Sequence, residues 1–304
     1  MTGTRCTEAR AAFDDYLGVR SRLPDARFGH DWQVAQSLLE IADPFDLVLL
    51  DAYGVLNVGE SAIPGAAAAI AALRAAGKAV AVVSNSAAYP KRVMMQRYAR
   101  LGFDLSPGEV VTSREALLAH LTRAPRLRWG AMLSPEYGVE DFEDVDISFL
   151  GDDPADYEAA EGFLLVGSEG WTKARQARLE AALSKRARPV FVGNPDIVAP
   201  RETGLSREPG DYAHRLADAT GVAPVFLGKP FDGIFSLALA RLFPGLAPER
   251  VLMVGDTLHT DILGGCQMGF STALVTDHGA LVGLDPARAI RRSGIVPDFV
   301  IGSI

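Results

Sequence analysis

Short apolar runs that alternate with amphipathic segments are the feature that most constrains the fold of this chain. Few polar residues interrupt these runs, which is typical of strands buried on both faces. Such strands belong to parallel sheets that helices cover on both sides. The predicted strands of this kind lie at residues 46–50, 78–83, 109–113, 250–256 and 271–277. The sequence therefore predicts an α/β fold with a doubly wound, parallel, Rossmann-like core.

The middle of the chain predicts a second, smaller α/β domain inserted into the first. Two apolar strands, at 162–167 and 189–193, flank a long helical segment there, and an acidic stretch precedes them. The chain before residue 45 has helical and loop character. The predicted division is an N-terminal helical extension packed on the core (1–44), the core itself (45–113 and 199–304) and the inserted domain (114–198).

The composition argues against several classes of protein. The 304 residues carry a formal net charge of −8, so no general basic surface is expected for nucleic acid or an anionic membrane. Cys6 and Cys266 provide neither a disulfide framework nor the spacing of a zinc site, and they fit a reducing cytoplasm. We find no signal-peptide pattern and no apolar run of membrane-spanning length. We expect a cytoplasmic protein without nucleic-acid or membrane partners, and a homo-oligomer is left open.

Polar residues follow three of the predicted core strands at the point where each strand ends. Asp51 follows the first strand, Ser84 and Asn85 follow the second, and Asp256 ends the fourth. In open α/β sheets, ligands bind beyond the carboxyl ends of the strands. We therefore expect these side chains to meet at one edge of the sheet.

Together with Lys229, these residues suit the transfer of a phosphoryl group. An aspartate such as Asp51 can attack phosphorus and form an aspartyl-phosphate. Mg²⁺ held by Asp51 and Asp256 would cancel the repulsion between carboxylate and phosphoryl oxygens, since this ion binds few carboxylates and completes its shell with water and substrate oxygens. Lys229 adds positive charge, and the hydroxyl and backbone amides at 84–85 bind the remaining oxygens. Positioning and electrostatic stabilisation are most of what the reaction requires.

Four ordered motifs resemble those of the haloacid dehalogenase superfamily, in its branch of aspartate-nucleophile phosphatases. They are LLDAYGVL, VVSNSA, GKP and VGDTLHTDILGG. Two further stretches, AIPGAAAAIAALRAAGK and GNPDIVAP, are similar to hallmarks of the class IIA hydrolases, which carry a large α/β cap between the second and third motifs. The resemblance covers residues 42–304 and implies that the inserted domain is such a cap, of the C2 type. Residues 1–41 fall outside it.

The resemblance implies a role for each matching position at the reacting centre. Asp51 would be the nucleophile and a Mg²⁺ ligand, and Lys229 would hold both the nucleophile and the phosphate. Asp256 would be a further Mg²⁺ ligand, and Asp261 would support the metal's water shell or the lysine. Tyr53 takes the place of a second aspartate, whose backbone carbonyl binds Mg²⁺ and whose side chain is the general acid and base.

The resemblance also implies which residues contact the substrate. Ser84, Asn85 and Ser86 match the phosphate-binding motif. Asn194, in the stretch that we expect to mark the return from the cap to the core, either contacts the substrate or shapes a turn.

Tyr53 preserves the metal-binding carbonyl but not the carboxylate that would move a proton. A phenol with a pKa of about 10 is a poor base at neutral pH, and general acid–base catalysis is typically worth ~10²–10⁴-fold. Three accounts of how the site works without this carboxylate follow. Another group supplies the proton transfer, with His259, His214 or a cap carboxylate as candidates. Alternatively, the enzyme acts on aryl or acyl phosphates, whose leaving groups need no proton, or the chain binds a phosphate ester without useful turnover.

The function that we expect is Mg²⁺-dependent hydrolysis of a small phosphorylated metabolite through an aspartyl-phosphate. The alternative is a catalytically weak or inactive sensor that retains the site. We favour the enzyme, because an unused site would have no need of several costly charges packed together. The substrate stays open: Arg201, Arg207 and His214 either bind a second anionic group or belong to a solvated surface.

Overall fold

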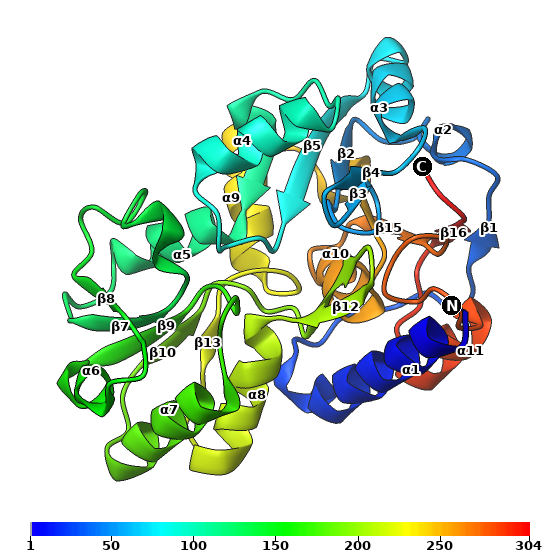
Figure 1. The fold of residues 1–304 in the computed structure, drawn as a ribbon. Helices are drawn as coiled ribbons and strands as arrows, with labels where there is room; N and C mark the ends of the chain where they lie inside the picture. The colour runs from blue at the N-terminus through cyan, green and yellow to red at the C-terminus, as the bar shows by residue number, and fades with distance from the viewer. Residues whose placement is uncertain (1) are drawn as a thin grey trace.

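A computed structural model describes residues 2–304, and the side chains from residue 6 onward. Its larger sheet contains seven strands: β1 (Gln33–Val34), β2 (Leu47–Leu50), β5 (Ala79–Ser84), β6 (Val110–Thr112), β14 (Val251–Gly255), β15 (Ser271–Val275) and β16 (Phe299–Ile301). They pair in parallel in the order β1-β16-β15-β14-β2-β5-β6. All five core strands predicted from the sequence are among them, and Figure 1 labels β2, β5 and β15 of these.

Helices cover both faces of this sheet. The helices around it are α2 (Leu38–Ile41), α3 (Ala66–Ala75), α4 (Lys91–Arg100), α5 (Ser113–Leu121), α9 (Asp232–Leu242), α10 (Leu263–Gln267) and α11 (Pro286–Ser293). Side chains alternate along a strand, so Val48 and Leu50 of β2 pack with α3 and α4. Leu47 and Leu49 point the other way and pack with α9. Burial on both faces explains why β2 is apolar throughout, and the predicted doubly wound α/β core is confirmed.

The smaller sheet belongs to the inserted domain. Its strands are β7 (Trp129–Met132), β8 (Ile147–Phe149), β9 (Gly162–Leu165), β10 (Val190–Val192) and β13 (Val225–Phe226), in the parallel order β13-β10-β9-β7-β8. The helices packed with it are α6 (Pro154–Ala159), α7 (Lys173–Lys185) and α8 (Pro209–Thr220). We call this unit the cap.

The cap extends further along the chain than the sequence predicts. We expected the chain to re-enter the core at residue 199, but β13 pairs with β10 of the cap sheet. Ala213 and Leu216 of α8 pack in the same apolar cluster as Leu179 of α7. The apolar spacing of α8 predicts a buried helix face but does not specify which sheet covers it, so the predicted boundary at 198/199 was wrong.

Two hairpins and several short turns complete the chain. One hairpin joins β3 (Asn57–Val58) to β4 (Ser61–Ala62), and the other joins β11 (Val198–Arg201) to β12 (Gly204–Arg207). The stretch GNPDIVAP leads into the second hairpin, and α8 follows it. Single turns of 3-10 helix lie at Arg20–Arg22, Pro107–Glu109, Pro135–Tyr137 and Pro248–Arg250, and a π-helical turn lies at Leu258–Ile262.

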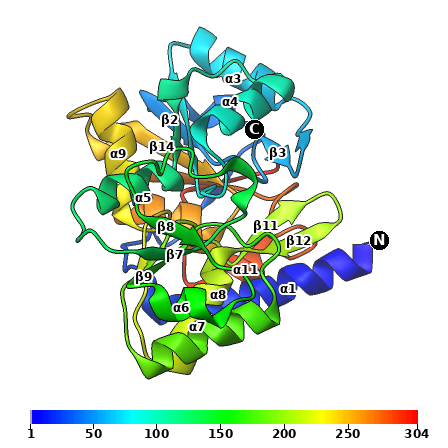
Figure 2. The same ribbon diagram turned by 60° about the vertical axis from the view of Figure 1, so that its left-hand side comes forward.

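The N-terminal extension begins with the helix α1 (Thr2–Val19), which contacts more than the core. Phe13 packs with Leu258 of the core, whereas Tyr16 packs with Ile197, just before the hairpin β11–β12. In Figure 2, α1 passes close to β12 and α8. Over residues 2–304, no helix combines the length and apolar character needed to cross a membrane.

Candidate active site

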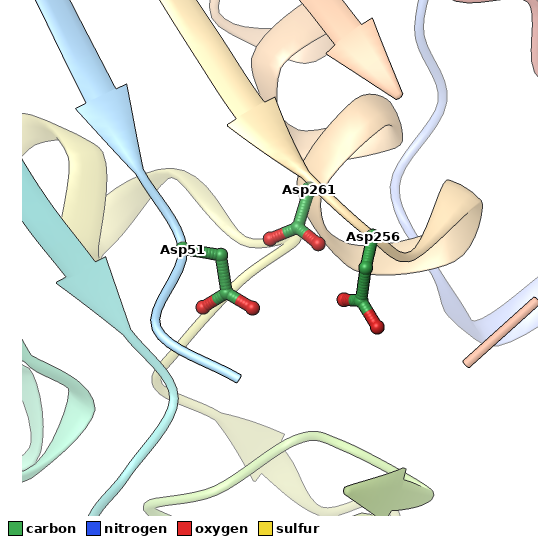
Figure 3. A group of neighbouring side chains, drawn as sticks. All are labelled: Asp51, Asp256 and Asp261. Atoms are coloured by element: carbon green, nitrogen blue, oxygen red, sulfur yellow. The ribbon is translucent and has the colours of Figure 1, made fainter. Parts of the chain in front are cut away.

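Three buried carboxylates meet where neighbouring core strands end. Asp51 follows β2 and Asp256 follows β14, and these two strands are paired in the sheet. Asp261 lies on the π-helical turn that comes next, which returns its side chain toward the same point. One oxygen from each of the three lies within 4.8 Å of the other two. Figure 3 shows the three side chains, which come from neighbouring elements, gathered at this point. The predicted convergence at one sheet edge is therefore present for these residues.

Lys229 is the cation of this cluster. Its Nζ lies 2.5 Å from Asp51 Oδ1 and 2.7 Å from Asp261 Oδ1, and its side chain is almost completely buried. Burial disfavours the ammonium form, but the charges of Asp261 and Asp51 outweigh this effect and raise the pKa of Lys229 above its ordinary value. The lysine is therefore charged and already in contact with the expected nucleophile.

The cluster has more negative than positive charge. Burial raises the pKa of Asp51 to about 6, although the ammonium of Lys229 opposes the shift and Asp261 adds to it. Burial and the charges of Asp261 and Asp51 also raise the pKa of Asp256 well above its usual range. Three carboxylates against one ammonium leave a surplus of charge that a divalent cation would neutralise. Oxygen ligands of this kind are those that Mg²⁺ binds, so the residues present fit the predicted metal.

Hydrogen bonds and close backbone contacts fix the carboxylates of Asp256 and Asp261. Asp256 accepts from the backbone N–H of Ala280 (2.6 Å) and from the hydroxyl of Thr257 (2.9 Å). Asp261 accepts from the backbone N–H of Thr257 (3.1 Å). Gly54 approaches so closely that a Cβ there would lie 2.6 Å from Asp256 Oδ2. The acidic positions are thus set by the fold itself.

The predicted phosphate-binding residues divide into two groups. Ser84 and Ser86 line the cavity beside Asp51, and Ser84 Oγ accepts from the backbone N–H of Ser86 (3.2 Å). Asn85 also lines the cavity, but its side chain is engaged with Lys229: it donates to the Lys229 carbonyl (3.0 Å) and accepts from the Lys229 N–H (2.7 Å). Asn85 therefore fixes the backbone of Lys229, and the substrate contacts of Ser84, Asn85 and Ser86 remain predictions.

Asn194 shapes the loop that leads to β11. Its Oδ1 accepts from the backbone N–H of Asp196 (3.0 Å), and its Nδ2 donates to Glu208 (3.2 Å). Asp196 in turn accepts from Asn85 Nδ2 (2.7 Å). Asn194 and Asp196 both line the cavity. Asn194 therefore holds a turn at the cavity wall. This placement is compatible with both roles that the sequence leaves open, which are contact with the substrate and shaping of a turn.

Tyr53 directs its hydroxyl toward two arginines. The oxygen accepts from Arg97 Nη1 (2.6 Å) and from Arg201 Nη1 (3.3 Å). Both guanidinium groups also lie over the ring, with Cζ at 5.3 Å and 5.0 Å from its centroid. Glu60 pairs with Arg97, and Glu208 pairs with Arg201 at 3.0 Å. The phenol is therefore part of an ionic cluster at the cavity wall.

The two histidines suggested for proton transfer lie outside the cavity wall. His259 is covered by the ring of Tyr16, and burial lowers the pKa of His259 to about 3. His214 stacks on Phe226 in the cap, and burial lowers its pKa to about 4. Among the residues that line the cavity in the described chain, none is a histidine. Neither residue is placed to move a proton at the phosphoryl group.

The cavity has walls from both domains. The core contributes Asp51, Ser84 and Asp256, and the cap contributes Ser168 and Glu169. Its volume is about 80 Å³, below the ~300 Å³ or more of typical ligand pockets. The enclosed space therefore suits a small ligand.

Several residues at this site escape the motifs of the sequence. Arg201 lines the cavity, whereas Arg207 pairs with Asp15 (2.5 Å) and Asp211 (3.2 Å) outside it. Arg97 was not predicted, although its spacing from Met94 puts a charged residue on the buried face of α4. That spacing was the sequence signal that could have identified Arg97 as a buried charged residue. Nothing in the sequence around Glu169 indicated that it lines the cavity.

Comparisons with known proteins agree with this geometry. Family models described as haloacid dehalogenase-like hydrolase and HAD-hydrolase-like match residues 48–148 and 226–303. Glycerol-3-phosphate phosphatase of Homo sapiens is 31% identical over 305 residues, which covers 89% of this chain and 91% of that protein. Chronophin of Bos taurus is 32% identical over 84% of this chain and 90% of its own length.

Solved structures show the same fold. A possible sugar phosphatase from Cytophaga hutchinsonii superposes with a TM-score of 0.77 at 25% identity, over 90% of this chain and 98% of the other. The p-nitrophenyl phosphatase from Archaeoglobus fulgidus has a TM-score of 0.68 at 26% identity, over 85% of this chain and 96% of the other.

Proposed function

This chain belongs to the haloacid dehalogenase-like hydrolases, as a phosphatase of their class IIA branch, and we propose that it hydrolyses a small phosphomonoester with Mg²⁺ through an aspartyl-phosphate. The observation that carries the proposal is the contact of Lys229 with Asp51 in a buried cluster that also holds Asp256 and Asp261. Relatives named as phosphatases of glycerol 3-phosphate and of dihydroxyacetone support a small phosphorylated metabolite as substrate. The small volume of the cavity also supports a small substrate.

The chemistry has two steps at Asp51. Its carboxylate oxygen bonds to phosphorus, and the bond from phosphorus to the substrate oxygen breaks as that oxygen leaves and takes a proton. Water then attacks phosphorus, which releases inorganic phosphate and restores the carboxylate. Lys229 neutralises charge on the nucleophile and on the transferring group. Asp51, Asp256, the Tyr53 carbonyl and Asp261 would hold Mg²⁺, which supplies further charge neutralisation when it is bound.

A cavity carboxyl group is the best remaining source of the leaving-group proton. Asp196, Glu169 and Glu208 line the cavity, whereas His259 and His214 do not. Burial raises the pKa of Asp196 well above its usual range, although Lys229 opposes the shift. Asp196 therefore keeps a proton under conditions in which an exposed aspartate has lost it. We assign the general-acid role to Asp196 on this basis.

Replacement of the nucleophile tests the proposed function. Asp51→Asn should abolish Mg²⁺-dependent phosphate release from p-nitrophenyl phosphate, because the amide cannot form the acyl phosphate. Asp46→Asn, at the exposed opposite end of β2, is the matched control and should retain the wild-type rate. Chelation by EDTA should stop the wild-type reaction. Full activity in Asp51→Asn would remove the nucleophile assignment.

A sensor of a phosphorylated metabolite is the second candidate, and Tyr53 is the observation that favours it. Its hydroxyl is paired with two arginines, so no carboxylate occupies the position of the usual acid and base. A sensor would bind phosphate esters with Mg²⁺ in calorimetry and release no phosphate from any ester in a chemically varied panel. Turnover of even one small ester at a rate that Asp51→Asn abolishes would rule the sensor out.

A further inference from the structure

We propose that Tyr16 of the N-terminal helix α1 is a positioning residue that joins two walls of the active site. One wall is the loop with Asp256 and Asp261, and the other is the loop with Asp196. The inference deepens the proposed function, since it concerns the same site. It also gives a role to the N-terminal extension, which precedes the residues matched by the family models.

The ring of Tyr16 packs against the loop with Asp256 and Asp261 and supports it through His259. Tyr16 is 4% exposed and stacks on His259 with a centroid distance of 5.1 Å and an interplanar angle of 8°. Phe13 contacts the same imidazole edge-on at 5.7 Å. His259 stands between Asp256 and Asp261 in the chain. Over residues 6–304, no protein atom forms a hydrogen bond with its buried Nε2. Stacking from α1 is therefore a principal constraint on this ring.

The hydroxyl of Tyr16 supports the second wall. It accepts a hydrogen bond from the backbone N–H of Ile197 at 3.0 Å. Ile197 follows Asp196, which accepts from Asn85, and Asn85 fixes the backbone of Lys229. A short chain of contacts therefore connects the Tyr16 hydroxyl to the catalytic lysine. If Tyr16 only filled space, an apolar ring would serve equally well.

Ion pairs fasten the rest of α1 across the two domains. Asp15 pairs with Arg207 of β12 at 2.5 Å, and Arg22, just after α1, contacts Asp218 and the His214 carbonyl of α8. On the core side, Asp14 pairs with Arg292 of α11 at 2.8 Å. In Figure 1, α1 accordingly lies beside α11 and extends toward α8. Tyr16 occupies the middle of this bridge, where both active-site loops are within reach.

Two substitutions separate the ring from the hydroxyl. Tyr16→Phe keeps the stack on His259 and leaves the Ile197 N–H without its partner. Tyr16→Leu removes both contacts. If Tyr16 positions both walls, Tyr16→Phe should lower kcat about tenfold, since small displacements of reacting groups are costly, and should leave the Mg²⁺ dissociation constant unchanged. Tyr16→Leu should lower kcat similarly and also raise that constant about tenfold, as losses of supporting contacts do at metal sites.

The experiment measures three quantities on the full-length chain. They are kcat for p-nitrophenyl phosphate, the Mg²⁺ dissociation constant by calorimetry without substrate, and the melting temperature in EDTA. Asp14→Asn is the matched control on α1, because it breaks the exposed ion pair with Arg292 and leaves Tyr16 in place. It should keep the wild-type kcat and metal affinity. Rates are compared at a temperature at which every variant is folded.

The proposal is decided by whether the substitutions change kcat and the Mg²⁺ dissociation constant separately. Loss of kcat in Tyr16→Phe, with loss of Mg²⁺ affinity only in Tyr16→Leu, supports the proposal. Lower melting temperatures with unchanged kcat and an unchanged Mg²⁺ dissociation constant would show that Tyr16 acts by packing alone, and any other pattern would also overturn the proposal. If Tyr16→Leu does not fold, an unchanged kcat in Tyr16→Phe still overturns the hydroxyl's role. Absence of phosphatase activity in the wild type would instead overturn the proposed function, and calorimetry would still test the ring.

Discussion

Tyr53 stands where the haloacid dehalogenase motif usually has a second aspartate. The tyrosine side chain makes contacts that a carboxylate at this position would not make. The hydroxyl reaches Arg97 and Arg201, and the ring lies under both guanidinium groups. A tyrosine is longer than an aspartate, so its polar atom lies further from the backbone loop that follows Asp51. The side chain therefore fixes the cavity wall, and proton transfer is assigned to Asp196.

Replacement of Tyr53 tests whether a carboxylate on this loop would add to the proton transfer that Asp196 provides. Tyr53→Asp returns a carboxylate to the loop, and kcat for an alkyl phosphate such as glycerol phosphate should rise, by up to ~10²-fold. The rise for p-nitrophenyl phosphate should be smaller, because that leaving group needs no proton. Tyr53→Phe is the control that removes the hydroxyl without adding a carboxylate. Alkyl turnover that stays flat or falls in Tyr53→Asp would show that a carboxylate at this position adds nothing to the proton transfer from Asp196.

The pKa of Asp51 gives a pH dependence with a definite sign. Its folded value of about 6 exceeds the ordinary 3.8, chiefly because of burial. Between these values the folded chain holds a proton that the unfolded chain has released. The contribution of Asp51 to the free energy of unfolding is therefore fully present below the unfolded pKa and decreases as pH rises through the folded pKa. Mg²⁺ binds the deprotonated carboxylates, so its stabilising effect should grow over the same range.

Denaturant unfolding of the wild type and of Asp51→Asn measures this effect. In EDTA, the stability of the wild type relative to Asp51→Asn should fall from about pH 4 to about pH 7. Added Mg²⁺ should stabilise the wild type more at the upper end of that range. A relative stability that rises with pH in EDTA would contradict the environment described for Asp51.

The positions of the candidate active-site residues could be predicted from the sequence better than the contacts that support them. Asp51, Asp256 and Lys229 stand beside strand ends or in short motifs, and parallel pairing brings such positions together. The contact from Tyr16 to Ile197 spans 181 residues, and no local pattern specifies a pairing at that separation. The contacts of the Tyr53 hydroxyl were not predictable either, because Arg97 and Arg201 are also distant from Tyr53 in the chain.

At the scale of elements, the turn after β2 packs closely against Asp256, which we propose as a Mg²⁺ ligand. Gly54 has φ of 81° and lies so close to Asp256 that a Cβ would meet Oδ2 at 2.6 Å. Gly77, after α3, has φ of 77° with no atom within 4 Å of an added Cβ. The two positions share the backbone conformation and differ in what surrounds them.

Alanine at these two positions separates backbone strain from metal binding. Gly54→Ala and Gly77→Ala should each lower the free energy of unfolding by roughly 1 kcal/mol, because both force a side chain into the left-handed region. Only Gly54→Ala should weaken Mg²⁺ binding in calorimetry, since the new Cβ displaces the Asp256 carboxylate. Equal Mg²⁺ affinity in the two variants would place the metal away from Asp256.

The elements themselves show where prediction from sequence stops. Uninterrupted apolar runs such as β2 and β14 were predicted as buried strands, and both are central in the sheet. The helix α8 was assigned to the wrong domain, because amphipathic spacing reveals a buried face and not its partner. The two-residue strand β13 is too short to carry a periodic signal, yet it fixes the end of the cap.

At the scale of the whole molecule, the active site is formed between two sheets and supported by the N-terminal helix. The core supplies the charges, and the cap narrows the cavity with Ser168 and Glu169. An inserted cap was predictable from the change of pattern after residue 113. The contact of the cap with the N-terminal extension was not predictable, because that contact depends on ion pairs such as Arg22 with Asp218 between segments far apart in the chain.

Capture of the phosphoryl group on the enzyme tests the central claim most directly. The protein is quenched in acid during turnover of p-nitrophenyl phosphate with Mg²⁺, and its peptides are analysed by mass spectrometry. We predict one added phosphoryl group on the peptide that contains Asp51, removed by hydroxylamine as an acyl phosphate is, and absent from Asp51→Asn. Turnover with no such adduct on Asp51, or with the phosphoryl group on another residue, would contradict the account.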